Sequence, residues 1–489
     1  MTDLRTVADR HLVAALEPEL GVLVDGHWGP GHAGTFEVED PATGVVIASV
    51  ADGDATDAVA AVDAAARSLP AWSAVPPRRR SDLLARVREL MLRDADQLAA
   101  LVSLENGKSL PDARAEVVYA AEFFRWYAEE AVRPHGDYGS SPGGGTRTIV
   151  THRPVGVAAL VTPWNFPAAM ATRKIAPALA AGCTVVLKPA AETPLTALAL
   201  ARLVAEAGVP AGVLNVVPGV DAAGIVSSWL ADARVRKLSF TGSTGVGRIL
   251  LRQAADRVVN TSMELGGNAP FVVTASADVA AAVEGAVTAK FRNGGQACTA
   301  ANRFYVHADV AEEFTARLGA AVEALRVGPA DEGSDIGPLV SAKALAGVTS
   351  LVDGAVQRGA TVAHRAPAVP QRGHFYPPLV LTGVPADDPL LEQEIFGPVA
   401  PIVVWHDTAE LIATVNGGEY GLAAYVYGEL AEALRIGEAL EAGMIGINRG
   451  VVSDPSAPFG GVKQSGIGRE GARDGLEEYL ETQYLSIAW

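Results

Sequence analysis

The sequence predicts an α/β protein built from two doubly wound parallel-sheet domains and a small β arm. The chain has 489 residues, which is more than one hydrophobic core usually serves. Apolar strands alternate with helical segments from about residue 155, and the same pattern begins again at "APFVVT" and runs to about residue 450. Such continuous apolar strands between helices are typical of a parallel sheet that is covered on both faces.

Residues 56–133 precede the first sheet, and their pattern predicts a run of helices. The segment "SDLLARVRELMLRDADQLAALVSLENG" has the 3.6-residue apolar period, and we expect an N-cap at Ser81 and a stop at Gly107. The following "GDYGSSPGGGTRTIVTHRPVG" is rich in Gly, Ser and Pro before it passes into alternating β-formers. This change indicates an exposed turn that leads into a strand or a hairpin.

The two strand-and-helix cycles set the expected domain boundaries, with Gly266 and Gly267 as the hinge between them. We assign residues 1–133 and 153–266 to the first domain, 267–455 to the second, and 134–152 with 470–489 to the arm. The C-terminal "LEEYLETQYLSIAW" is short, partly alternating and aromatic. It is therefore suited to add an edge strand to a neighbouring subunit.

Composition and charge exclude several classes of partner. Because 49% of the residues are apolar, we expect an ordered globular protein. The net charge of −17 makes nucleic acid and anionic membranes poor partners. No segment reaches bilayer length and the N-terminus has no cleavable apolar core, so a cytoplasmic protein is expected. Two cysteines cannot form a disulfide framework, and no Cys or His spacing predicts a metal site.

The two cysteines stand in different surroundings. Cys183 in "AAGCTVVLKP" enters an apolar strand, where a thiol normally fills the core. Cys298 follows the turn "NGGQA" and precedes "TAANRF", which we interpret as a helix start whose amides would favour a thiolate. This stretch alone leaves two interpretations of Cys298 open, a nucleophile and a structural thiol.

Glu264 and Asn165 are further candidates for the same chemistry. Glu264 precedes two glycines in "MELGG", where a carboxylate can swing as a general base. Asn165 in "TPWNFP" lies at the end of a predicted strand, where its amide can meet a developing oxyanion. Taken alone, each motif favours the simpler interpretation of a surface carboxylate or a turn residue.

Together, these residues and their surroundings resemble the non-acylating branch of the aldehyde dehydrogenase superfamily. The resemblance covers nearly the whole chain in the family's order, in the segments "TPWNFP", "KIAPALAAGCTVVLKP", "ETP", "SFTGSTGVG", "MELGG", "GGQAC", "EIFGPV" and "PFGGVKQSGIGREG". It implies a thiolate attack by Cys298 on an aldehyde, hydride transfer to a nicotinamide, and hydrolysis of the thioester by water that Glu264 activates. Asn165 and the Cys298 backbone amide would hold the oxyanion.

The resemblance also implies that the first domain binds a dinucleotide, that the second is catalytic, and that the chain forms a homodimer or homotetramer through the arm. "FTGSTGVG" lies between a strand and a helix, so Gly242, Ser243 and Gly247 are expected to present a helix N-terminus to a diphosphate. The resemblance adds contacts to the two riboses and to the nicotinamide end, from Lys188, Glu394, Phe396 and Trp164.

The choice between NAD and NADP depends on one position. Relatives that prefer NAD often carry a glutamate three residues after the lysine that corresponds to Lys188. Here Ala191 occupies that position and Glu192 follows it. A neutral residue does not repel a 2′-phosphate, so we expect NADP and leave NAD open because Glu192 is adjacent.

Arg173 in "ATRKIAPAL" and Arg292 in "FRNGGQAC" are the candidates for substrate recognition. Unpaired cations beside a pocket are costly, so they predict an anionic ligand, unless each pairs with a protein carboxylate. Here the resemblance narrows to succinate-semialdehyde dehydrogenases, in which two arginines and a serine, matching Ser453, hold the substrate carboxylate. The alternatives are glutarate semialdehyde, a neutral aliphatic aldehyde, or a non-catalytic relative. Ala300, two residues after Cys298, excludes a local disulfide switch.

Overall fold

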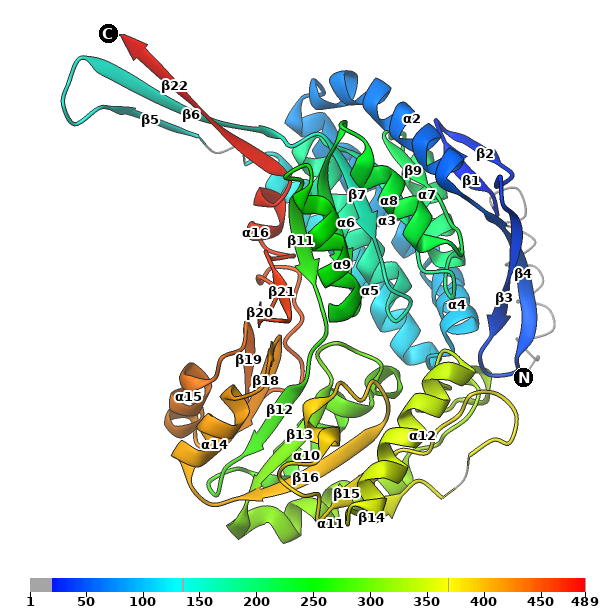
Figure 1. Cartoon of the computed structure of the whole chain (residues 1–489), viewed down its shortest axis with the longest axis vertical. Helices are drawn as coiled ribbons and strands as arrows, with labels where there is room; N and C mark the ends of the chain where they lie inside the picture. Colours follow the sequence, from blue (N-terminus) through cyan, green and yellow to red (C-terminus); the bar gives the residue numbers. More distant parts are fainter. Residues whose placement is uncertain (1–19, 134–135, 368, 489) are drawn as a thin grey trace.

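The computed structural model describes residues 20–133, 136–367 and 369–488. These residues form two large sheets with flanking helices and a narrow β arm that projects from the body (Figure 1). The predicted α/β class is therefore confirmed. Residues 1–19 of the first predicted domain and residues 134–135 and 489 of the predicted arm lie outside the described residues, as does residue 368. In the described ranges, no helix combines the length and the apolar character needed to cross a membrane.

The first sheet has eight strands, in the order β2-β1-β9-β8-β7-β10-β11-β21. Its five central strands, from β9 to β11, pair in parallel, and β1 and β21 pair antiparallel with them. In sheet order the bounds are His27–Gly29, Val22–Val24, Leu214–Val216, Thr184–Lys188, Val157–Val161, Val235–Thr241, Asn260–Glu264 and Gly466–Ile467. Every residue of β7 and β8 is buried, as expected for a sheet covered on both faces.

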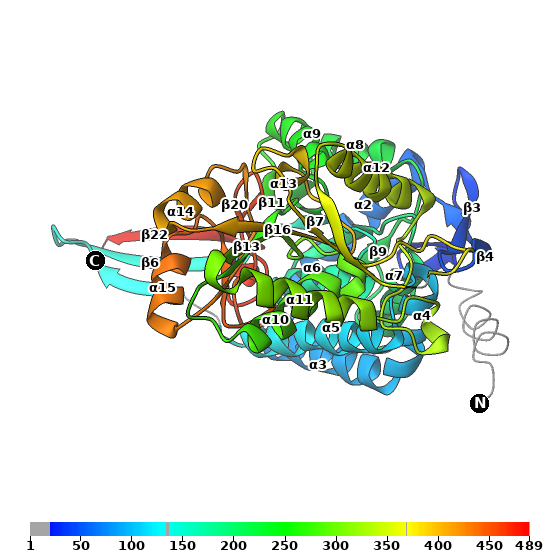
Figure 2. The same ribbon diagram turned by 90° about the horizontal axis from the view of Figure 1, so that it is seen from below.

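Eight helices of the described chain surround this sheet: α2 (Ala55–Ser73), α3 (Pro77–Arg93), α4 (Ala95–Asn106), α5 (Leu110–Ala131), α6 (Pro167–Ala181), α7 (Leu195–Glu206), α8 (Ala222–Ala231) and α9 (Thr244–Ala255). Figure 2 shows α2, α8 and α9 on one side of the sheet and α3, α5 and α6 on the other. The predicted N-cap at Ser81 is wrong, because α3 begins at Pro77 and buries Ser81. Gly107, with a φ of 87°, does end a helix as predicted.

The second sheet has seven strands, in the order β14-β15-β16-β13-β12-β18-β19, and only the β14–β15 pair is antiparallel. In that order the bounds are Thr361–Arg365, Leu379–Thr382, Val399–Trp405, Ala301–His307, Ala269–Val273, Ala423–Tyr427 and Met444–Ile447. Its helical segments are α10 (Val279–Phe291), η2 (Arg292–Gly295), α11 (Ala308–Ala324), η3 (Ala330–Glu332), α12 (Ala342–Gln357), α13 (Pro389–Glu392), α14 (Thr408–Asn416) and α15 (Leu430–Ala439).

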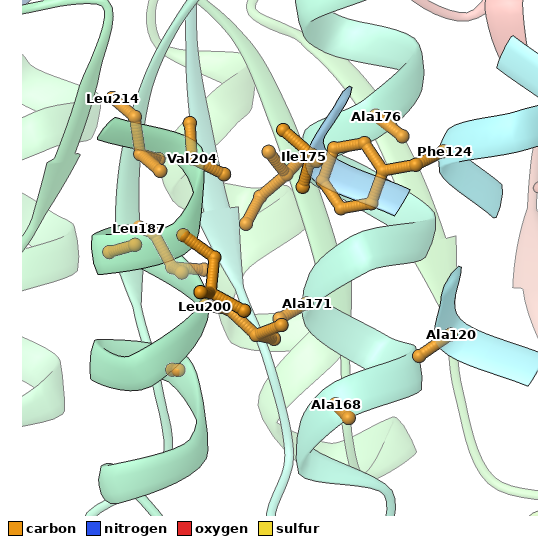
Figure 3. Packing of buried hydrophobic residues seen from close by; sticks show 14 of the residues in the cluster. Ala120, Phe124, Ala168, Ala171, Ile175, Ala176, Leu187, Leu200, Val204 and Leu214 are labelled. Atoms are coloured by element: carbon orange, nitrogen blue, oxygen red, sulfur yellow. The ribbon is translucent and has the colours of Figure 1, made fainter. Parts of the chain in front are cut away.

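Helix α6 provides a rigid base for the loop that precedes it. All of its residues are buried. Figure 3 shows Ile175 of α6 between Phe124 of α5 and Val204 of α7. Seven of the fifteen residues of α6 are alanines, and these small side chains let neighbouring helices pack closely against it. The loop between β7 and α6, residues 162–166, is consequently held at both ends by core elements.

The arm is a three-stranded antiparallel sheet in the order β22-β6-β5, with bounds Leu480–Ala488, Thr146–Pro154 and Asp137–Ser140. Strands β5 and β6 form the predicted hairpin. Both views show the arm extending beyond the helices (Figures 1 and 2). The remaining elements are the strand pairs β3 (Gly34–Asp40) with β4 (Val45–Asp52) and β17 (Tyr420–Gly421) with β20 (Val462–Lys463), and helix α16 (Asp474–Glu477).

Candidate active site

A cavity of about 400 Å³ receives side chains from the connections of both large sheets. Strands β7, β10 and β11 all direct their carboxyl ends toward it, which is where parallel sheets usually bind ligands. The predicted residues that line it are Trp164, Asn165, Arg173, Gly242, Ser243, Arg292, Cys298, Glu394, Phe396 and Ser453. Lys188, Ala191, Gly247 and Glu264 are outside its lining, although Leu265 and Gly266 place Glu264 next to it.

Cys298 lies on the wall of the cavity, and its side chain is partly exposed. Because residues 301–307 form strand β13, the helix start predicted after this cysteine is wrong. Burial raises the pKa of the Cys298 thiol to about 12, and Arg173 opposes this shift while Glu394 and Glu264 add to it. The thiol is thus accessible but protonated at neutral pH. Cys183, in contrast, is fully buried, as predicted for a core residue.

Glu264 is the last residue of β11, and both of its carboxyl oxygens are buried without a hydrogen-bond partner among the described residues. Burial raises its pKa well above the ordinary value, and repulsion from Glu470 adds to the shift. The two following glycines allow close backbone packing, because a side chain at Gly267 would collide with the carbonyl of Cys298. Glu264 therefore lies buried, with a raised pKa, beside the loop that carries the thiol.

Asn165 joins the two halves of the site. Its side-chain Nδ2 donates a hydrogen bond to the carbonyl of Gln296 at 3.0 Å, in the loop that leads to Cys298. A carboxamide nitrogen carries two N–H donors, so one remains for the cavity that Asn165 lines. Its Oδ1 is buried and has no partner among the described residues. The amide is thus fixed in a position from which it can stabilise negative charge in the cavity.

Arg173 differs from the expectation of an unpaired cation. Its guanidinium is almost fully buried, and its Nε lies 2.6 Å from Oε2 of Glu470. The guanidinium carbon also stacks 4.0 Å from the ring centre of Phe459. Glu470 comes from a segment almost 300 residues away in the sequence, so local patterns could not reveal the pair. The part of Arg173 that lines the cavity remains able to meet a ligand.

Arg292, at the start of η2, makes no ion pair with any residue that the structure describes. Its guanidinium carbon lies 5.4 Å from the ring centre of Phe166, an arrangement that supports a cation without neutralising it. Ser453 lines the same cavity and is partly exposed. The cavity therefore combines two guanidinium groups and a hydroxyl with the thiol, a set of donors that suits an anionic ligand.

The segment between β10 and α9 has the geometry of an anion site. Ser243 is the N-cap of α9, and its Oγ accepts a hydrogen bond from the amide of Val246 at 3.4 Å. A side chain at Gly242 would collide with the Phe240 ring, and one at Gly247 would collide with Leu265. Glycines are thus required where the chain turns into the helix, and the free amides of its first turn suit a diphosphate.

Lys188 ends β8, and its Nζ donates to the carbonyl of Pro189 at 3.0 Å. Burial lowers its pKa to about 8, although Glu192 and Asp52 oppose the shift. An ammonium group with donors to spare suits a hydroxyl or a phosphate of a nucleotide. Ala191 is partly buried and Glu192 is exposed.

Glu394 and Phe396 also line the cavity. Glu394 Oε1 accepts a hydrogen bond from the amide of Gly267 at 3.2 Å, and burial raises its pKa to about 7. Phe396 has a φ of 51°, in the left-handed region that larger residues rarely adopt. Its ring meets Trp164 edge to face at 5.4 Å. A strained aromatic residue at a cavity wall is a common feature of functional sites.

Several residues that contact this site were not predicted: Lys108, Glu116, Tyr119, Asn293 and Glu470. Tyr119 and Glu116 line the cavity from α5. Lys108 follows the glycine that ends a helix, a position that is usually exposed, so its burial has no signal in the local sequence. Glu470 lies within the segment "PFGGVKQSGIGREG", but nothing in that segment shows which cation it meets.

Comparison with known proteins agrees with the geometry of this site. The profile of the aldehyde dehydrogenase family matches residues 28–485. Succinate-semialdehyde dehydrogenase of Paenarthrobacter nicotinovorans is 50% identical over 91% of this chain and 99% of its own. The NADP(+) succinate-semialdehyde dehydrogenase GabD of Escherichia coli K12 is 48% identical over 95% and 97%. The crystal structure of an NADP-dependent E. coli enzyme superposes with a TM-score of 0.94 at 47% identity, covering 96% and 98%.

Proposed function

The chain belongs to the aldehyde dehydrogenase family, and from this premise we propose that it oxidises succinate semialdehyde to succinate with NADP. The observation that supports this choice of substrate is that one cavity holds the Cys298 thiol together with Arg173, Arg292 and Ser453. A thiol attacks an aldehyde carbon, and guanidinium groups bind a carboxylate. A short aldehyde acid satisfies both groups at once.

The residues of the site have distinct roles in this proposal. Cys298 gives its thiol proton to solvent water, and its sulfur forms a bond to the aldehyde carbon. The amide of Asn165 and the backbone N–H of Cys298 stabilise the oxyanion. A nicotinamide held beside Trp164 and Phe396 would supply the acceptor for the hydride of the substrate carbon. Glu264 then takes a proton from water, the water oxygen attacks the thioester carbon, and the C–S bond breaks to release the acid.

The cofactor assignment depends on the fit of the residues at the end of the first sheet. Gly242, Ser243 and Gly247 would hold the diphosphate, Lys188 the adenosine ribose, and Glu394 the nicotinamide ribose, with Trp164 and Phe396 at the nicotinamide end. The partly buried Ala191 brings no charge that would repel a 2′-phosphate. Relatives that carry NADP in their names support this choice. NAD is the alternative, with Glu192 as its ribose partner.

Glutarate semialdehyde is the second candidate substrate. An enzyme of Pseudomonas putida with the name glutarate-semialdehyde dehydrogenase is 47% identical over 95% of this chain and 97% of its own. The same carboxylate donors would serve an acid with one more methylene, and such a difference discriminates only about 10- to 200-fold. A neutral aliphatic aldehyde would leave both guanidinium groups without a ligand.

Steady-state kinetics with two aldehydes, each assayed with NADP and with NAD, tests the proposal. We expect kcat/KM for succinate semialdehyde to exceed that for butanal by about 10³-fold, because the neutral aldehyde brings no carboxylate to the partly buried Arg292, which has no ion-pair partner among the described residues. NADP should give the higher value than NAD. The variant Cys298→Ala, which removes the nucleophile, serves as the inactive control. Equal rates with the acid and with butanal would exclude the carboxylate site.

The domain roles and the assembly belong to the same proposal. The first domain, residues 1–133 and 153–266, would bind the cofactor, and the second, residues 267–455, would carry the nucleophile. The arm, with its edge strand β22, would join subunits into a homodimer or homotetramer. The exposed aromatic and aliphatic side chains of the arm support this role.

A further inference from the structure

A buried ion pair lies beside the cavity, where the helical region 95–131 contacts the loop at residues 162–166. Lys108 Nζ lies 2.5 Å from Oε2 of Glu116, and both side chains are fully buried. We infer that Lys108 and Glu116 are positioning residues, which hold the backbone of Asn165 so that its amide meets the oxyanion. This inference rests on the proposed function, because it needs Asn165 as the oxyanion donor.

Lys108 acts on the backbone of Asn165 directly. Its Nζ donates a hydrogen bond to the carbonyl of Asn165 at 2.8 Å and lies 4.0 Å from the ring centre of Phe166. The same carbonyl accepts a second hydrogen bond from Nδ2 of Asn293 at 2.9 Å. With both lone pairs of this carbonyl occupied, the peptide plane after Asn165 cannot rotate without breaking buried hydrogen bonds.

Glu116 secures the other end of the loop. Its Oε1 accepts hydrogen bonds from the amides of Ala168 and Ala169, at 2.9 and 3.2 Å, in the first turn of α6. An anion at a helix N-terminus satisfies amides that have no partner within the helix. Lys108 and Glu116 together therefore connect the backbone of Asn165 to the rigid base that α6 provides.

The carbonyl of Trp164, one residue earlier, is held in the same way. It accepts hydrogen bonds from Nδ2 of Asn106 at 3.0 Å and from Oγ1 of Thr193 at 3.3 Å. Two consecutive carbonyls of this loop are thus fixed by four side-chain donors. From this fixed backbone, the side chain of Asn165 reaches the carbonyl of Gln296 and the cavity.

Stability alone does not explain this pair. Apolar residues of similar volume often replace a buried ion pair without loss of stability, because desolvation offsets most of the Coulomb attraction. What apolar residues cannot supply is a charged donor to the Asn165 carbonyl and an acceptor for the first turn of α6. The pair contacts the backbone of the predicted oxyanion donor, so it can keep the Asn165 amide in place. Such positioning matters because a displacement of about 1 Å can reduce a catalytic rate about 10²-fold.

A double-mutant cycle separates positioning from general destabilisation. We expect Lys108→Met, which keeps the apolar stem, to lower kcat for succinate semialdehyde about 10- to 100-fold with KM changed by less than about 3-fold. In the Asn165→Ala background the same substitution should lower kcat by less than about 2-fold. The matched control is Lys237→Met. Lys237 is equally buried and pairs with Glu478 at 2.9 Å away from this loop, so its loss should lower the melting temperature and leave kcat unchanged.

A structural readout makes the test independent of turnover. Crystal structures of Lys108→Met and of the milder Glu116→Gln should show the Asn165 amide displaced from the carbonyl of Gln296. If the loop is unchanged in a folded variant, or if Lys108→Met costs as much without Asn165 as with it, the positioning role is excluded. A wild-type protein that oxidises no aldehyde would instead refute the proposed function, while the crystallographic comparison would still decide the role of the pair.

Discussion

The thiol of Cys298 and the carboxyl of Glu264 both have raised pKa values, which determine how kcat/KM depends on pH. Burial raises the pKa of Cys298 to about 12 and that of Glu264 well above its ordinary value. Both groups act in their deprotonated forms, and both forms become more populated as pH rises. We expect kcat/KM to increase from pH 6 to pH 9, as measured in steady-state assays with saturating cofactor. A rate that falls over this range would contradict the assigned roles.

Arg173 offers a sharper test at the same scale. Its positive charge lowers the pKa of Cys298 against the effect of burial. In Arg173→Met we therefore expect slower alkylation of Cys298 by iodoacetamide at pH 8, together with a loss of about 10²-fold or more in kcat/KM for succinate semialdehyde. The control variant Cys298→Ala should take up no label, because Cys183 is fully buried. Unchanged alkylation would show that Arg173 does not act on the thiol.

Sequence patterns located individual residues better than their partners. Cys298, Asn165 and Arg292 were selected from short motifs, and all three line one cavity. The contact between Arg173 and Glu470 was not predictable, because it joins residues almost 300 positions apart. The hydrogen bond from Lys108 to the Asn165 carbonyl was equally hidden. Short motifs therefore identify reactive residues, whereas the ion pairs that these residues form depend on which distant segments the fold brings together.

At the scale of elements, the glycines of α9 have different roles. Gly247 faces the sheet, and a side chain there would collide with Leu265, the neighbour of Glu264. Gly245 lies on the exposed side of the same helix with open space around it. We expect Gly247→Ala to destabilise the protein by about 1–3 kcal/mol and to weaken NADP binding, because overpacking displaces α9 or Leu265.

Gly245→Ala is the matched control for this substitution. Alanine is a better helix former than glycine by about 0.5–1 kcal/mol, so the melting temperature of the Gly245→Ala variant should equal or exceed that of the wild type. Calorimetry of the protein without cofactor measures both effects, and titration with NADP measures affinity. Equal stability of the two variants would show that α9 has room against the sheet.

The boundaries of elements were the least predictable feature of the fold. The apolar period from residue 81 to 107 correctly indicates helix, but it does not show the break at Asp94 between α3 and α4. The chain after Cys298 was interpreted as a helix, yet residues 301–307 are the buried strand β13. A short apolar segment fits either state, and its pairing with β12 and β16 decides the outcome.

At the scale of the whole molecule, the arm raises the question of what covers it. Tyr138, Tyr484, Leu485 and Ile487 are all exposed there, Tyr484 by 59%. Strand β22 is also the edge of its sheet, so one row of its backbone groups has no strand partner within the described chain. Exposed apolar edges invite association, and natural proteins usually cover them.

We therefore expect the double variant Leu485→Asp with Ile487→Asp to dissociate the assembly. Leu485 and Ile487 lie on the same face of β22. Charges on that face would have to be desolvated at a subunit contact, which is costly when they find no partner. Light scattering after gel filtration should give a mass near the 50.5 kDa of one chain for this variant and a multiple of it for the wild type. Ser486→Asp, which adds a charge on the opposite face of β22, is the control for the face involved. A wild-type protein that is itself monomeric would exclude the arm as an oligomerisation element.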